Sequence, residues 1–246
     1  MRRGVCPGMQ PIYDWFRDFY DRTGINLNFI YDDFDRARMI KGFILTVELA
    51  VITIVLSVII GVLGAWLQGS KLVWVRRIIA GFISFFRNTP PLVQIYFFYF
   101  GLPEAGILLS SFVSVLLGLT LNAGAYLTEI MRAGFVSVRR TELEAAETLG
   151  FSLPQQVRYV VLPHIAKTIY PALANFFIIL VLGTSMAAVF GVDELTGTAI
   201  NISTENYRWI EMFTVVAAIY IVLTFLASLL LAAVGWWGFR VRAKVF

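Results

Sequence analysis

The sequence predicts an all-α membrane protein with five transmembrane helices and one short helix on the cytoplasmic side. Only 15% of its 246 residues are charged, whereas soluble domains carry about a quarter charged residues. Five apolar stretches are each long enough to cross a bilayer, which requires about 20 residues in a helix. Lysine and arginine flank these stretches, as is typical of loops that stay in the cytoplasm. The predicted spans are residues 43–67, 78–100, 107–131, 167–189 and 210–237, within one transmembrane domain at 42–246.

Residues that carry enzyme chemistry are missing from the sequence. Cys6 is the single cysteine and His164 the single histidine, which excludes an intrachain disulfide and leaves no Cys-based or His-cluster metal site. No GxxxxGK[ST] loop, HExxH or GxSxG motif occurs. We therefore predict that this chain is not an enzyme and holds no catalytic residue, metal or cofactor. The net charge of +4 comes from basic residues beside the spans, which favours membrane topology over nucleic-acid binding.

Residues 1–41 precede the first span and mix aromatic with charged residues. Trp15, Phe16, Phe19 and Tyr20 fall on one helical face, which favours an amphipathic helix at the membrane surface. A poorly ordered tail is the alternative interpretation. We predict a periplasmic or interfacial segment without the short apolar core of a cleavable signal peptide.

The first predicted span carries a stripe of small residues. Thr46, Thr53, Ser57, Gly61 and Gly64 recur at spacings near three, four and seven. Such a stripe is typical of a helix that packs closely against others in a membrane bundle.

The second predicted span has polar residues and two prolines near its middle. These are Arg87, Asn88, Thr89, Pro90 and Pro91. A charge and an amide are costly on a lipid-facing helix, so we expect them to face the bundle interior or a wet cavity. A structural or gating role for Arg87 is favoured over direct contact with a solute.

Polar residues also share one face of the third span. Asn122, Tyr126 and Glu129 lie on that face. Glu129 and Arg132 are three residues apart near the end of the span. If the two side chains pair with each other, their role is structural. If they face each other across a pathway, their role is functional. The sequence leaves both interpretations open.

The basic residues predict the orientation of the chain. They follow the first, third and fifth spans, which places the N-terminus outside and the C-terminus inside. Arg36, Arg38 and Lys41 before the first span argue for the opposite orientation. In the predicted topology, residues 191–208 form an outer loop.

A polar stretch at Arg139–Pro163 separates the third and fourth spans and has the pattern helix, turn, helix. Acidic residues occupy the first turns of a predicted helix at 141–150, where the helix dipole favours them. Gly150 is placed to end this helix with a left-handed cap, and Ser152 to begin the next. Two interpretations are open: the short helix fits a groove of a partner protein, or it is a solvated loop.

The same stretch carries a sequence signature. Glu144, Ala145 and Ala146, followed three residues later by Gly150 and then by Val160–Pro163, resemble the EAA signature of ABC importer membrane subunits. Three further segments resemble permeases for polar amino acids: FRNTPPLVQIYFFYFGLP at 86–103, LNAGAYLTEIMRAGFVSV at 121–138 and GTSMAAVFGVDELTG at 183–197. The sequence is therefore similar to ABC transporter permeases over about residues 40–200.

This resemblance implies a type I importer permease in the bacterial cytoplasmic membrane. Two permease subunits, identical or paralogous, would enclose the pathway, two cytoplasmic ATPases would hold ATP and Mg²⁺, and a periplasmic solute-binding protein would dock above. Residues 141–150 would be the coupling helix in a groove of the ATPase, and alternating access would import a polar amino acid. The implied coupling residues are Glu142, Glu144, Ala145, Ala146, Gly150, Leu162 and Pro163. The expected pathway residues are Arg87, Asn88, Gln94, Asn122, Tyr126, Glu129, Thr184 and Ser185, each with an alternative role in hydrogen bonding between helices.

The fourth span departs from the family pattern. Leu182 and Gly183 stand where similar permeases commonly have Lys followed by Asp or Asn. This difference motivates an alternative solute for the same machine: an opine, a sulfur compound or another small zwitterion. A hypothesis from a different class is a channel or scaffold without ATP coupling.

Overall fold

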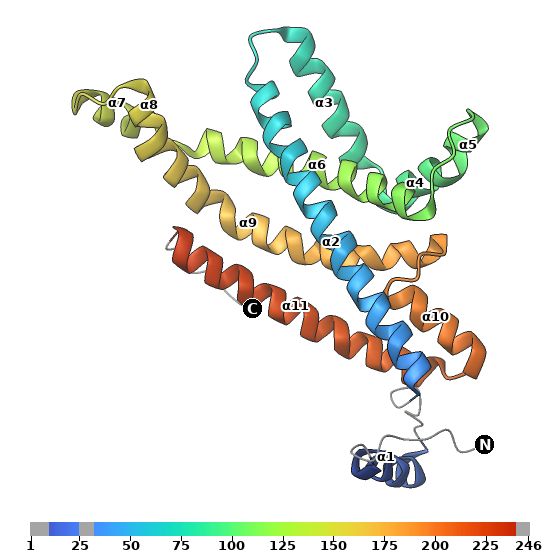
Figure 1. Ribbon diagram of the computed structural model, residues 1–246. Coiled ribbons are helices and arrows are strands. Elements are labelled where there is room, and N and C mark those ends of the chain that lie inside the picture. The colour runs from blue at the N-terminus through green and yellow to red at the C-terminus, as the bar shows by residue number, and fades with distance from the viewer. Residues whose placement is uncertain (1–9, 25–31, 240–246) are drawn as a thin grey trace.

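The computed structural model describes residues 10–24 and 32–239, and every regular element within those residues is helical (Figure 1). The elements are α1 (Gln10–Thr23), α2 (Asp33–Gln68), α3 (Val73–Asn88), α4 (Pro91–Tyr96), the π-helical η3 (Phe97–Gly101), α5 (Leu102–Glu104), α6 (Ser111–Ser137), α7 (Arg140–Thr148), α8 (Leu153–Gln156), the π-helical η4 (Val157–Val161), α9 (Leu162–Gly183), the 3₁₀-helical η5 (Thr184–Phe190), α10 (Leu195–Asn206) and α11 (Trp209–Phe239). Cys6 lies outside the described residues.

Four helical stretches are long and apolar enough to cross a membrane: Asp33–Gln68, Ser111–Ser137, Leu153–Phe190 and Trp209–Gly238. The helix of the predicted span at 78–100 is interrupted, because α3 ends at Asn88 and α4 begins at Pro91. Pro90 and Pro91 have no backbone N–H, so the helical hydrogen-bond ladder stops there. The count of five spans stays a prediction.

The helix of the fourth predicted span begins earlier than expected. Instead of starting near residue 167, α8, η4, α9 and η5 form one helical stretch from Leu153 to Phe190. The π-helical turn η4 directly precedes Pro163, and such a local adjustment lets a helix continue through a proline. The spanning helix is therefore connected closely to the polar stretch before it.

The predicted helix of the N-terminal segment is present as α1. Trp15 and Tyr20 are exposed on it, and Arg22 pairs with Asp18 at 2.9 Å. The side chains of Phe16 and Phe19 lie outside the described residues. The position of α1 at a membrane surface stays a prediction.

The small-residue stripe of α2 packs against α6. All of its members are buried: Thr46, Thr53, Ser57, Gly61 and Gly64. A Cβ on Gly61 would lie 2.7 Å from the Cβ of Leu127, and one on Gly124 would lie 2.5 Å from Cγ2 of Ile60. Glycines on both helices thus let the two backbones approach, as the spacing predicted.

The helices define two ends of the bundle (Figure 1). At one end, α7 and α8 connect α6 to α9; at the other, α10 lies between η5 and α11. We call these the α7 end and the α10 end. Gly134 near the end of α6 contacts Ile165 near the start of α9, so these two helices run antiparallel.

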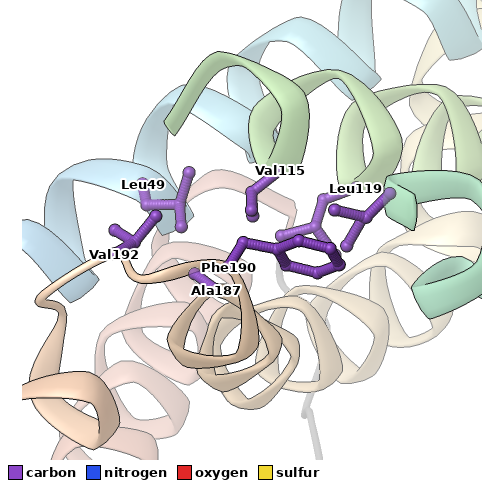
Figure 2. Close-up of a cluster of buried hydrophobic side chains, with 7 residues drawn as sticks. Leu49, Val115, Leu119, Ala187, Phe190 and Val192 are labelled. Carbon is purple, nitrogen blue, oxygen red and sulfur yellow. The ribbon is translucent and has the colours of Figure 1, made fainter. Parts of the chain in front are cut away.

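A hydrophobic cluster joins α2, α6 and η5 toward the α10 end, and Figure 2 shows the aromatic ring of Phe190 among side chains from these elements. Its buried members are Leu49, Ile95, Val115, Leu119, Ala187, Phe190 and Val192. A second cluster joins α10 to α11 through Leu195, Ala199, Ile202, Met212 and Val216. These contacts fix η5 and α10 to the spanning helices.

The prediction of a loop at 191–208 is wrong, because most of these residues form the helix α10. Glu194 caps this helix by accepting a hydrogen bond from the backbone N–H of Gly197 at 2.9 Å. Its carboxylate is fully buried and also accepts from the Tyr220 hydroxyl at 2.9 Å and the Thr46 hydroxyl at 3.2 Å. Because a buried carboxylate must be hydrogen-bonded, Glu194 ties α2, α10 and α11 together.

An ion pair fastens the start of α2 to α10. Arg38 donates to the two carboxylate oxygens of Glu205 at 2.8 and 2.9 Å. This two-point hydrogen bond with Arg38 holds the pKa of the Glu205 carboxyl below its ordinary value. The α10 end is therefore closed by polar as well as apolar contacts.

Candidate functional site

The break between α3 and α4 is the centre of a polar cluster. In an uninterrupted helix, the carbonyl oxygens of Phe86 and Arg87 would accept hydrogen bonds from the backbone N–H groups of residues 90 and 91. Both of those residues are prolines, so the two carbonyls need other donors.

Side chains of α4 and α6 supply these donors. The carbonyl of Phe86 accepts from Asn122 Nδ2 at 2.6 Å and from Gln94 Nε2 at 2.9 Å. The carbonyl of Arg87 accepts from the Tyr126 hydroxyl at 3.4 Å. We call Gln94, Asn122 and Tyr126 the polar cluster. These three residues, expected in the pathway, hold the broken helix against α6.

Replacing Gln94 with leucine is expected to lower the free energy of unfolding by about 1–3 kcal/mol. Gln94 is buried, and its Nε2 also donates to the carbonyl and hydroxyl of Thr89 at 3.1 and 2.6 Å. Thermal denaturation in detergent measures the change. Asn88→Ala is the control, since Asn88 is exposed and its amide lies 3.3 Å from the Ser84 hydroxyl. Equal losses in the two variants would contradict this role of Gln94.

A charged cluster made of Gln68, Arg87, Glu129 and Arg132 adjoins the polar cluster. Arg132 donates to both oxygens of Glu129 at 2.9 and 3.2 Å, and Gln68 Nε2 donates at 3.3 Å. Arg87 Nη1 lies farther from the same carboxylate, at 3.8 Å, and its guanidinium is 5.1 Å from the ring centre of Tyr126. One carboxylate thus faces two cations, tightly bound to one and loosely to the other. Glu129 and Arg132 pair with each other, and Glu129 also faces α3.

A groove of about 500 Å³ opens beside the charged cluster, between the ends of α2 and α6. Gln68 and Arg132 line it together with the exposed aromatic side chains of Trp66 and Phe135. Because Arg132 and Arg87 both have partly exposed side chains, the charged cluster is accessible from outside this chain.

Thr184 and Ser185 lie in η5, and the hydroxyls of both are hydrogen-bonded to the preceding turn of helix. Their hydroxyls donate to the carbonyls of Val181 and Leu182 at 2.7 and 2.8 Å. Within residues 10–24 and 32–239, neither hydroxyl bonds to the polar or the charged cluster. Thr184 is fully buried. Their place in a pathway stays a prediction.

The polar stretch between α6 and α9 has the predicted helix, turn, helix form. α7 ends at Thr148, and Gly150 follows in the left-handed conformation with φ +79°. The backbone N–H of Phe151 returns to the carbonyl of Ala146 at 3.0 Å, which closes the helix end. Ser152 begins the next helix, with its N–H donating to Gln155 at 2.8 Å.

The two faces of α7 differ. Ala146 is 3% exposed and packs inward, whereas Glu144, Ala145 and Glu147 are exposed. Leu162 and Pro163, at the start of α9, are exposed as well. The helix thus presents an exposed, charged surface with small residues at one end of the molecule, on which Arg140 pairs with Glu144 at 2.8 Å.

Two polar residues of the structure were not predicted from the sequence to have the positions that they occupy. Gln68 reaches Glu129 from the last residue of α2, and Glu194 is buried rather than part of an exposed acidic loop. The second had a signal in the sequence: Leu195, Ala199 and Ile202 follow Glu194 at helical spacing, which indicates a helix with an acidic cap.

Comparisons with known proteins consistently identify permeases of transport systems. Residues 57–235 match the family described as binding-protein-dependent transport system inner membrane component. The chain is 32% identical to the octopine transport system permease protein OccM of Rhizobium radiobacter, over 80% of this chain and 84% of that protein. It is 33% identical to the glutamine transport system permease protein GlnP of Escherichia coli, over 78% and 89%.

Solved structures are similar over the same part of the chain. A crystal structure of an amino acid ABC transporter with histidines is 33% identical, covers 80% of this chain and 92% of its own, and gives a TM-score of 0.75. An inward-facing structure of the MetNI methionine ABC transporter is 18% identical, with coverage of 80% and 91% and a TM-score of 0.58. Because the sequence identity is only 18%, the similarity to the second structure shows the fold alone.

Proposed function

Because this chain belongs to the family of binding-protein-dependent transport system inner membrane components, we propose that it forms half of the pathway of an ABC importer for a polar amino acid. It is a multi-pass inner-membrane permease with the type I importer fold. The observation that carries the proposal is α7, a short exposed helix that short links connect to α6 on one side and to the helical stretch containing α9 on the other.

α7 is placed to pass a displacement into the bundle. It follows α6 after the short link at Val138 and Arg139, and it leads through the turn at Gly150 into the helical stretch that contains α9. α6 carries Asn122 and Tyr126 of the polar cluster. A movement imposed on α7 by ATPase subunits therefore reaches the broken helix α3–α4 through α6.

The proposed partners are those of a binding-protein-dependent importer. Two ATPase subunits, which hold ATP and Mg²⁺, bind the α7 end from the cytoplasm, and a periplasmic solute-binding protein docks at the α10 end. A second permease, identical or paralogous, completes the pathway. The N-terminus then lies outside and the C-terminus inside, as the basic residues after the spans favour.

The charged cluster is the proposed gate. Discontinuous helices near the middle of a membrane are typical of solute sites in transporters. Arg87 is loosely held by Glu129 at 3.8 Å, whereas Arg132 is held tightly. During alternating access, Arg87 leaves Glu129 and so opens the gate, and Arg132 keeps the carboxylate neutralised.

The proposed solute is a zwitterion with an amino-acid head group. Support comes from the glutamine permease of Escherichia coli and the octopine permease of Rhizobium radiobacter, whose names give their solutes. The alternative within the same machine is an opine or a sulfur compound. Leu182 and Gly183 in the fourth span, together with the octopine relative, favour this alternative.

Uptake by the assembled importer tests the function. Vesicles that contain this chain, its ATPase, its second permease and its binding protein are given labelled L-glutamine, L-arginine, L-octopine and L-cystine. We expect uptake of at least one that requires ATP and the binding protein. Uptake of octopine alone would select the opine alternative. Solute movement that continues without ATP would contradict an importer and support a channel.

A further inference from the structure

The first turn of α7 is joined to the start of α9 by a side-chain contact. His164 Nδ1 lies 3.1 Å from Oε2 of Glu142. In the part of the chain that the structure describes, this is the contact between a carboxylate and an imidazole that links the two helices. Both side chains are partly accessible, with 28% and 34% of their surfaces exposed.

Glu142 lies on the inner face of α7. It is four residues before Ala146, and residues at this spacing share a helical face. Ala146 is buried, whereas Glu144 and Ala145 are exposed on the side away from it. The contact with His164 therefore leaves the outer face of α7 open to a partner.

The connection at the other end of α7 is a turn followed by a π-helical segment. The chain turns at Gly150 with φ +79° and passes through the π-helical η4 before α9 begins. Turns with positive φ and π-helical segments are places where helices change direction. The contact between the first turn of α7 and α9 is a second attachment, so α7 is held near both of its ends.

We propose that His164 is a positioning residue of the transport cycle, which fixes the coupling helix, α7, to α9 through its contact with Glu142. The inference rests on the proposed function, because it assumes that α7 receives movement from an ATPase. It gives the single histidine a role in transmitting that movement.

The contact lies among other charged groups. Those on the surrounding elements are Lys167 on α9, Arg139, Arg140, Glu144 and Glu147 at α7, Arg158 on η4 and Arg132 on α6. Of these, Arg140 is paired with Glu144 and Arg132 with Glu129.

Spin-label distances between α7 and α9 test the inference. Labels on Glu147→Cys and Thr168→Cys, in a Cys6→Ser background, report the angle of α7 in the complete importer in lipid nanodiscs. We expect one narrow distance in wild type. In His164→Ala, the narrow population falls about fivefold and a broader population appears. His164→Gln keeps a polar side chain at this position, so it retains more of the narrow population than His164→Ala.

A functional readout separates positioning from folding. Trapping with ATP and vanadate is expected to shift the labels in wild type and in the control Lys167→Gln, and about fivefold less in His164→Ala. Glu142→Ala reduces the response by a similar amount even with His164 intact, and adding His164→Ala then changes nothing further.

Two results would overturn the inference. One is a His164→Ala distance distribution that matches wild type; the other is an unchanged response to vanadate trapping. Failure of the proposed function gives a different result, since the wild-type chain would then assemble with no ATPase and show no trapped state.

Discussion

Replacing Gly150 with proline is expected to reduce ATP-driven uptake at least about tenfold. Gly150 has φ +79°, which proline cannot adopt, and its backbone N–H donates to the carbonyl of Glu147 at 2.9 Å. The change therefore removes both the left-handed cap and a hydrogen bond at the end of α7. Uptake and ATP hydrolysis by reconstituted vesicles, measured together, detect the loss as hydrolysis without transport.

Gly150→Asn is the matched control for this prediction. Asparagine tolerates the left-handed conformation better than other residues with a side chain, and no atom lies within 4 Å of a Cβ at this position. We expect Gly150→Asn to keep most of the uptake. If the proline and asparagine variants transported equally well, the turn would have no part in coupling.

Replacing Gly61 with leucine is expected to lower the free energy of unfolding by about 3 kcal/mol. A Cβ there would lie 2.7 Å from the Cβ of Leu127 and 3.1 Å from its carbonyl carbon. Backbone atoms cannot move aside as a flexible side chain can, so α2 and α6 must separate. Tryptophan fluorescence during heating is expected to show a midpoint lower by roughly 10 °C.

Gly81→Ala serves as the comparison, because a Cβ on Gly81 meets nothing within 4 Å. Alanine favours a helix more than glycine does, so this variant is expected to be as stable as wild type or up to about 1 kcal/mol more stable. A loss at Gly81 as large as that at Gly61 would mean that close packing of α2 on α6 is not the cause.

The helix, turn, helix at Arg139–Pro163 was predictable because its signals are local. Gly150 ends α7 and Ser152 begins the next helix, as expected from their residue types. The resemblance to ABC importer permeases, read from the same stretch and three others, is confirmed by the family match over residues 57–235. Local turn chemistry and a family signature were sufficient here.

The arrangement around the broken helix was only partly predictable. Pro90 and Pro91 indicate disruption of the helix, but nothing nearby in the sequence shows which side chains replace the missing donors. Asn122 and Tyr126 do so from α6, far along the chain. Sequence periodicity placed them on one face without identifying the carbonyls that they meet.

The α10 end was predicted least well. Residues 191–208 are polar and rich in Thr, Asn and Glu, a composition that is typical of loops. Burial of Glu194 among Thr46, Gly197 and Tyr220 requires contacts from three elements. Tertiary contacts outweigh local composition there, and no single stretch of sequence contains them.

Site-specific photo-crosslinking tests most directly whether α7 receives movement from an ATPase. A photoreactive residue at exposed Ala145 on α7 is compared with one at Tyr207, which is 85% exposed at the α10 end. We predict a crosslink from position 145 to the ATPase subunit, changed in yield by ATP, and none from position 207. A complete importer in which position 145 gives no ATPase crosslink, while ATP-driven uptake continues, would contradict the account.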